Sequence, residues 1–562
     1  MIRMALDEYM NPVHSPYRMI ASLPQQLKAV AFAFLATLVA LPANAGITVP
    51  TEPIQVGGRV APNILFVLDD SGSMAYTYMP DSVPNDWRRQ AYPINSIHYN
   101  PAITYQPWMS TAGDRTRMTG GTTYTDAYSD PDTASGAINL QGETRTFYVA
   151  INPAGNLNSQ ANYYRYQIHT DGRIVRSQYG TGTLGLADRG CGTSSTSWGS
   201  CTYALPSARS EADERNNYAT WYSYHRTRMK VAKAGVGEAF SDVGSNLRVG
   251  LRTIHRRTLS GNVITQDNPL LISRNSGLFV NEGVNDNRTE WYKRLYGATS
   301  SGDTPLRDAL NRAGQYFQSS AKTGPWGPEE GINQLSCRQN FTLLTTDGYT
   351  NETSYTNPVG EQDNTAGTAI TGELPGQTYT YSPGNPYSSA YGDNLGDVAM
   401  RYWKNDLRTD LVNNVRTSSA NPAFWQHMVT FAISIGAAGT LNPETDLPAI
   451  TAGTKFWPNP GNNNPKNIDD LWHAAVNGRG EFVLANDPTE FTAAMRRALS
   501  TILERTGSFS NLATSSGRVD SNTRSFLAHY ISGQWIGDLR AFAVTSTGVD
   551  TSTPLWSAAA GI

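Results

Sequence analysis

The sequence predicts an α/β protein whose main domain is a doubly wound parallel sheet carrying two large insertions. Four apolar runs have the length of β-strands and lack the alternation of a half-exposed strand: residues 63–69, 247–254, 341–345 and 428–435. Such runs suit strands that are covered on both faces. Segments of helical pattern separate these runs, and strands that alternate with helices indicate a parallel sheet with helical crossovers.

Four helices are predicted as these crossovers, at residues 218–239, 305–317, 396–415 and 488–503. The second begins with Pro305, and proline suits the first turn of a helix because its missing N–H has no partner there. The fourth follows Asp487, a residue type that accepts hydrogen bonds from the first free N–H groups of a helix.

Two insertions interrupt this pattern, at about residues 75–216 and 349–393, and both are rich in Tyr, Thr and Gly. The first is too long for an ordinary loop, so we expect it to contain structure of its own. Within it, Asp171-Gly172 separates residues 161–169 from residues 173–175, which is a β-hairpin signal. Both insertions leave from the ends of predicted strands that carry polar motifs.

The first 45 residues have the pattern of a secretory signal peptide. Arg18 and Lys28 precede an apolar run at residues 29–41, and the Pro-Ala-Asn-Ala that follows predicts cleavage after Ala45. A membrane anchor is the alternative, but the run is shorter than the roughly 20 residues that span a bilayer. We therefore expect export to the periplasm, outer membrane or cell surface.

Residues 46–510 form the predicted α/β domain, and residues 511–562 the start of a second, all-β domain. In the second segment, residues 525–530 and 539–544 have the pattern of two β-strands. Two strands are too few to form a stable sheet alone, so this segment is expected to be the beginning of a truncated domain.

Charge and cysteine content exclude several classes of protein. The net charge is -3 and charged residues make up 16% of the chain, so no basic surface for nucleic acid is expected. In an exported protein, Cys191 and Cys201 are candidates for a disulfide. The third cysteine, Cys337, is then either buried or paired with an unknown partner, and no cysteine spacing suggests zinc.

Three polar motifs predict a site for a divalent cation. The sequence Asp-Asp-Ser-Gly-Ser at residues 69–73 follows the first strand, Asp303-Thr304 precedes a helix, and Asp347 follows the third strand. The carboxyl ends of parallel strands meet at one edge of a sheet, where open α/β folds bind ligands. Carboxylate and hydroxyl oxygens suit Mg²⁺, and also Mn²⁺ or Ca²⁺. The predicted ligands are Asp69, Ser71, Ser73, Thr304 and Asp347.

In this order, the three motifs resemble the metal-ion-dependent adhesion site of von Willebrand factor A domains, which are Rossmann-like. The resemblance covers roughly residues 60–505. It implies that the hydroxyls contact the metal, that the aspartates hold it directly or through water, and that one position stays open for an acidic group of a ligand. The alternatives are a degenerate domain without metal, or Asp69 and Ser71 acting only as helix caps.

An enzyme is not expected. Asp70-Ser71-Gly72 is not followed by the H-G-T-H sequence of a subtilisin-like protease, and Ser71 stands where a haloacid-dehalogenase-type phosphatase would need a second aspartate two places after Asp69. A metal-dependent hydrolase remains a remoter alternative.

A second resemblance narrows the family. Residues 217–229, rich in aromatic side chains, and residues 337–341 before the Asp347 strand resemble the amino-terminal half of PilY-type type IV pilus tip proteins. This resemblance implies a fimbrial protein at the pilus tip that acts in pilus assembly, twitching motility and cell adhesion. Its implied partners are minor pilins and a host or abiotic surface. That family continues into a β-propeller. The alternative is a free secreted metal-dependent adhesin without a pilus role.

Overall fold

The structure is a computed structural model that describes most of the chain between residues 60 and 506. The described residues are 60–132, 135–179, 198–200, 206–255, 270, 272, 274–281, 286–352, 357–506, 510–514, 524–531, 536–545, 548–549 and 555–558. The predicted signal peptide and both candidate disulfide cysteines, Cys191 and Cys201, lie outside them. The chain divides into two units, and the larger contains Gly58–Ser510 and His529–Asp538.

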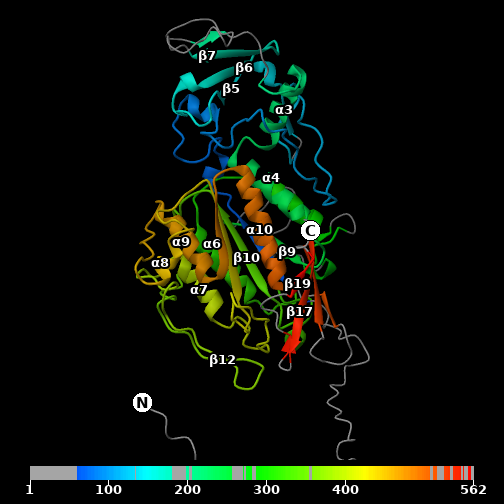
Figure 1. The fold of residues 1–562 in the computed structure, drawn as a ribbon, viewed down its shortest axis with the longest axis vertical. Coiled ribbons are helices and arrows are strands. Elements are labelled where there is room, and N and C mark those ends of the chain that lie inside the picture. Colours follow the sequence, from blue (N-terminus) through cyan, green and yellow to red (C-terminus); the bar gives the residue numbers. More distant parts are fainter. Residues whose placement is uncertain are drawn as a thin grey trace, which may run out of the picture. The chain divides into compact units, whose positions relative to one another are not determined.

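A five-stranded parallel sheet forms the centre of the larger unit (Figure 1). Its order is β14-β13-β10-β1-β9, so the first strand lies between two strands from much later in the chain. The strands are β1 (Asn63–Leu68), β9 (Arg248–Thr253), β10 (Asn340–Thr346), β13 (Met428–Ile435) and β14 (Arg479–Ala485). The four predicted strands are confirmed. The edge strand β14 was not predicted, because it is only half-buried and contains Arg, Gly and Glu.

Helices cover both faces of this sheet, which confirms the doubly wound arrangement. Ile64 and Phe66 of β1 pack in one core, which includes Phe240 of α4, Trp291 of α5 and Met495 of α10. The alternate residues of β1, Leu65 and Val67, pack in a second core with α6, α7 and α9. The helices are α4 (Arg228–Ser241), α5 (Asn287–Gly297), α6 (Leu306–Phe317), α7 (Leu395–Lys404), α9 (Lys466–Asn477) and α10 (Pro488–Thr506).

The prediction of one helix at residues 218–239 was wrong. Two helices, α3 (Glu211–Tyr224) and α4, occupy this segment. The break falls before Thr227, whose backbone is extended. The hydroxyl of Thr227 caps α4 by accepting the N–H of Lys230 at 3.2 Å. A threonine suits such a cap better than the middle of a helix, and this preference separates the two helices.

The prediction of a helix over residues 396–415 was wrong after its first nine residues, since α7 ends at Lys404. Asn405 is extended, and the N–H of Leu407 donates to Gln426 O at 2.8 Å, outside any helix. The start of α7 is fixed by a capping box between Asn394 and Asp397.

The predicted cap of α10 is confirmed, because the N–H groups of residues 489 and 490 donate to Asp487 Oδ1 at 2.7 and 2.9 Å.

The first insertion contains a sheet of order β2-β5-β6-β7-β8, as expected from its length. Its predicted hairpin is confirmed: β6 and β7 pair antiparallel, and Gly172 in their turn has a φ of +87°. Tyr99, Phe147 and Tyr166 pack against Trp221 of α3 in a separate core. The strands of this sheet are β2 (Ala91–Tyr92), β5 (Arg145–Ala150), β6 (Tyr163–Ile168), β7 (Ile174–Tyr179) and β8 (Trp198–Ser200), and a separate antiparallel pair consists of β3 (Ala127–Asp130) and β4 (Ser135–Ile138).

The second insertion contains a short antiparallel pair of strands, β11 (Ile370–Thr371) and β12 (Thr378–Tyr379). A short helix, α8 (Leu447–Thr451), lies further along the chain.

Cys337 is half-buried and is a free thiol. Among the helices of the described residues, none combines the length and the apolar character needed to cross a membrane.

The carboxyl-terminal segment forms a sheet of its own, in which β15, β16, β17 and β18 are neighbours and β19 pairs with β17. The two strands predicted there are confirmed as β16 and β17. That this sheet begins a propeller stays a prediction. The strands are β15 (Ser510–Thr514), β16 (Arg524–Ile531), β17 (Ile536–Thr545), β18 (Gly548–Val549) and β19 (Trp556–Ser557).

Candidate metal centre

The loops that carry the three polar motifs meet at the carboxyl edge of the central sheet. After β1 the chain enters a short 3-10 helix, Gly72–Ala75, and the N–H of Gly72 donates to Gly302 O at 3.0 Å. A Cβ on Gly72 would lie 3.2 Å from the same oxygen, so glycine permits this close approach. The third loop joins through the N–H of Asp347, which donates to Asp69 Oδ2 at 3.2 Å. The backbone therefore brings the predicted ligands to one edge.

Four of the five predicted ligands form one chain of polar contacts. Ser71 Oγ lies 3.0 Å from Ser73 Oγ, and the Ser73 hydroxyl donates to Asp347 Oδ1 at 2.7 Å. The carboxylate of Asp69 accepts the N–H of Ser71 and the hydroxyl of Thr346, each at 2.7 Å. Asp69 and Asp347 are fully buried. Two carboxylates and two hydroxyls thus converge from strands that are far apart in the sequence.

The fifth predicted ligand, Thr304, is placed by its backbone. Its N–H donates to Asn351 Oδ1 at 2.5 Å, from the loop that follows Asp347, and its side chain is buried. It lies two residues before the start of α6, on the loop whose Gly302 contacts Gly72. The structure therefore brings Thr304 to the same edge as the other four residues.

Burial gives this centre an affinity for positive charge. Desolvation raises the pKa of Asp69, and it raises the pKa of Asp347 to about 7, with a further contribution from the charge of Asp69. Arg228 opposes this rise in Asp347. Two adjacent buried carboxylates repel each other, so a proton or a cation that neutralises them is favoured. The donor set consists of oxygen atoms only, and it fits a hard divalent cation such as Mg²⁺.

Two residues beside the centre were missed by the sequence analysis. Arg228, in the first turn of α4, lies with its Nη1 3.1 Å from Asp347 Oδ2. His255, directly beyond the end of β9, lies with Nδ1 2.7 Å from Asp70 Oδ1 and Nε2 3.1 Å from Asp303 Oδ1. His255 thereby links the loop that follows β1 to the Thr304 loop. His255 belongs to no motif named above, and Arg228 lies in the aromatic-rich segment 217–229, which carries no signature of a metal site; only the fold brings both residues to the centre.

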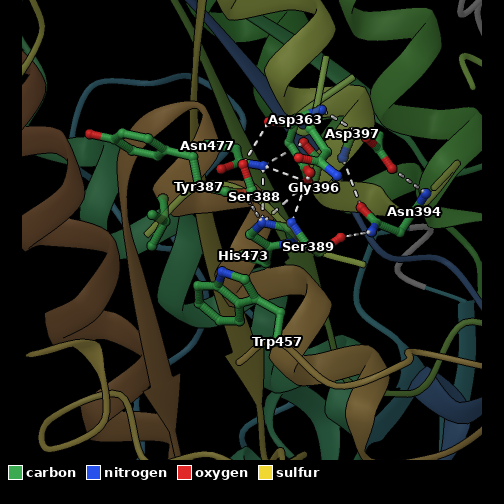
Figure 2. A network of polar contacts seen from close by, with 12 residues as sticks. Asp363, Tyr387, Ser388, Ser389, Asn394, Gly396, Asp397, Trp457, His473 and Asn477 are labelled. Carbon is green, nitrogen blue, oxygen red and sulfur yellow. Dashed lines mark hydrogen bonds and ion pairs between the residues drawn. The ribbon is translucent and has the colours of Figure 1, made fainter. Parts of the chain in front are cut away.

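A second polar network, also missed, lies where the second insertion meets α7 and α9. Figure 2 shows Asp363, Asp397, His473 and Asn477 gathered at this point. Asp397 accepts the N–H groups of residues 362 and 363 at 2.6 and 3.1 Å, in addition to capping α7. Asp363 accepts the N–H of Ser389 at 2.9 Å. These contacts fasten the insertion to α7, and the side-chain amide of Asn477 on α9 donates to Asp363 Oδ2 at 3.3 Å.

Burial makes the ionised form of the carboxyl groups in this network costly. Burial, and then the charge of Asp397, raise the pKa of Asp363 to about 8, and burial raises the pKa of Asp397 to about 6. One oxygen of each of Glu361, Asp363 and Asp397 lies within 4.8 Å of the others. Because backbone N–H groups already occupy much of their hydrogen-bonding capacity, we interpret the network as structural.

Together, fold and site define a doubly wound α/β protein with an oxygen-rich polar centre at the carboxyl edge of its sheet. The chain is 30% identical to the type IV pilus biogenesis factor PilY1 of Pseudomonas aeruginosa strain UCBPP-PA14, over 92% of this chain and 45% of that protein. PilY1 of strain PAK is 29% identical with the same coverage. The predicted resemblance to PilY-type proteins is confirmed, and the chain spans about half the length of these relatives. No protein-family model and no solved structure matches the chain.

Proposed function

We propose that this chain is the metal-dependent adhesive part of a type IV pilus-associated protein, and that its α/β domain is a von Willebrand factor A domain. The observation that carries the proposal is the convergence of buried oxygen ligands from three loops at the carboxyl edge of the sheet. In this proposal Asp69 and Asp347 hold a divalent cation, most favourably Mg²⁺, with the hydroxyls of Ser71, Ser73 and Thr304. The bound ion would supply a position that attracts an acidic group of a surface ligand.

The pilus role is supported by the relatives, which are named type IV pilus biogenesis factors. On this basis we propose that the protein is exported, associates with minor pilins at the pilus tip, and supports pilus assembly and twitching motility. Its ligand would be an acidic group on a host or abiotic surface. Binding by this centre requires no catalysis, and we propose none.

The metal site is tested by titrating the purified chain with MgCl₂ in a calorimeter. Wild-type protein should bind one equivalent, and the variants Asp69→Ala and Asp347→Ala should not bind. The matched control is Asp171→Ala, which removes an exposed carboxylate from a turn of the first insertion. Unchanged affinity in both site variants would remove the metal assignment.

The biological role is tested in the native host. The Asp347→Ala variant should lose attachment to surfaces, as should wild-type cells in the presence of a chelator. Tagged protein should co-purify with minor pilins. A protein that adheres but never co-purifies with pilins would instead be a free secreted adhesin.

A further inference from the structure

We propose that Arg228 is a positioning residue of the metal centre, which orients the Asp347 carboxylate and anchors the start of the first insertion beside it. This inference rests on the proposed function, because it concerns a side chain that acts on a metal ligand. Arg228 lies in the first turn of α4, and its side chain is 1% exposed although it is charged. A buried guanidinium needs partners for its donors, and these partners define its role.

The first partner is Asp347. Arg228 Nη1 donates to Asp347 Oδ2 at 3.1 Å and to the backbone oxygen of the same residue at 3.3 Å. The other carboxylate oxygen, Oδ1, accepts the hydroxyl of Ser73 at 2.7 Å. Rotation about the last bond of an aspartate is only weakly restricted, so these contacts decide the orientation of the carboxylate. Arg228 thereby leaves Oδ1 facing the two serines.

The remaining donors of Arg228 reach the first residues of the insertion. Nη2 donates to Asp81 Oδ1 at 2.5 Å, and Nε donates to Tyr78 O at 2.8 Å. The backbone N–H of Arg228 donates to Tyr76 O at 3.0 Å. The rings of Tyr76 and Tyr78 stack with centroids 5.0 Å apart, and the guanidinium carbon lies 5.2 and 5.5 Å from them. One side chain therefore ties residues 76–81 to the metal centre.

The charges around Arg228 explain why a cation beside the metal site does not oppose metal binding. Asp347 and Asp81 share this one guanidinium, and Asp69 adds a further carboxylate next to Asp347. The carboxylates outnumber the arginine within this group of four side chains. A divalent ion still gains net attraction, while the arginine keeps one ligand in a fixed orientation.

Lysine could not replace this arginine, although it carries the same charge. A planar guanidinium donates along fixed directions to several acceptors at once, whereas an ammonium group is a compact point charge. Arg228→Lys should therefore retain the charge and lose the orientation of Asp347. Residues that orient metal ligands typically change metal affinity by about 10- to 100-fold when replaced.

The experiment compares Mg²⁺ affinity, from calorimetry, with the free energy of unfolding in EDTA. Both Arg228→Lys and Arg228→Gln should weaken Mg²⁺ binding by about 10- to 100-fold. The matched control is Arg288→Lys, another buried arginine, which donates to the backbone oxygens of Val243 and Ser241 at 2.8 and 2.7 Å. The control should lose stability in EDTA but keep its Mg²⁺ affinity once folded.

A further variant, Asp81→Asn, leaves Arg228 in place and alters a residue that is 43% exposed, so it should fold even if the Arg228 variants do not. It should weaken Mg²⁺ binding, but less than Arg228→Gln does. Wild-type affinity in folded Arg228→Gln, or in Asp81→Asn if the Arg228 variants do not fold, would overturn this inference. Absence of Mg²⁺ binding by the wild-type chain would instead overturn the proposed metal site itself.

Discussion

The buried carboxyl group of Asp363 should make the stability of this protein depend on pH. Burial and the neighbouring Asp397 raise its pKa to about 8 in the folded protein, against 3.8 for an unperturbed aspartate. Between these two values the folded state binds more protons than the unfolded state. The free energy of unfolding contributed by this group is therefore full at low pH and falls as the pH rises from about 4 to about 8.

The magnitude follows from one proton. While Asp363 is protonated in the folded state and ionised in the unfolded state, its contribution falls by about 1.4 kcal/mol for each pH unit. Other groups change with pH as well. Burial lowers the pKa of Lys230 to about 6, which makes stability rise with pH, and raises the pKa of Asp470 to about 7, which makes it fall. The slope of one protein thus combines several groups, whereas the difference between two variants removes the groups that do not interact with Asp363 and leaves Asp363 with its neighbour Asp397.

We therefore compare wild-type protein with Asp363→Asn, which keeps the shape of the side chain and has no titrating proton. Urea unfolding in EDTA at pH 6.5, 7.0 and 7.5 should give the variant a slope about 1.4 kcal/mol per pH unit less negative than the wild type. The buried histidines, with pKa values of about 4 in the folded state against 6.5 in the unfolded state, still make stability rise with pH near pH 6.5, but they do so in both proteins. Asp171→Asn, an exposed control, should keep the wild-type slope. Equal slopes for wild-type and Asp363→Asn protein would refute the reasoning.

Three further predictions follow from the fold and the site. Asp347→Ala should abolish Mg²⁺ binding in calorimetry and cost little stability in EDTA, because relief of the repulsion from Asp69 offsets the lost ion pair with Arg228, which keeps Asp81 as a partner; a large loss of stability in EDTA would contradict this. Gly314→Ala should destabilise by about 1 to 3 kcal/mol, because the added Cβ would lie 2.2 Å from the Tyr402 ring; unfolding at the wild-type urea midpoint would count against it. Peptide mapping of exported protein should find a disulfide between Cys191 and Cys201, worth about 2 to 3 kcal/mol; two free thiols would exclude it.

Strands and motifs with a strong local signature were predictable from the sequence. The apolar run of β1 is buried on both faces, and a residue pattern of that kind has few other structural solutions. The ligand motifs were predictable because each follows a strand or precedes a helix. The edge strand β14 was not, since solvent exposure removes the apolar signature. The break between α3 and α4 depends on one threonine cap, which a helical pattern on both sides concealed.

The contacts around the ligands could not be predicted from the sequence. Arg228 is separated from Asp347 by 119 residues, and only the pairing of β1 with β9 and β10 brings their neighbourhoods together. Asp363 and His473 likewise meet through the packing of α7 and α9. A local pattern carries no information on such pairs. Their identity depends on the complete fold.

The first insertion begins two residues after Ser73 and leads through α3 back to α4, whose first turn contacts Asp347. Its two ends are thus held at neighbouring points. Met79, Ile97, Trp108 and Met109 of the insertion pack in a core of the sheet, whereas Tyr99, Phe147 and Tyr166 pack in a core of their own. Only the part of the insertion with this separate core could change without disturbing the packing of the central sheet. In the proposed function, a change in that part of the insertion would alter the preference for a surface and leave the proposed metal ligands in place.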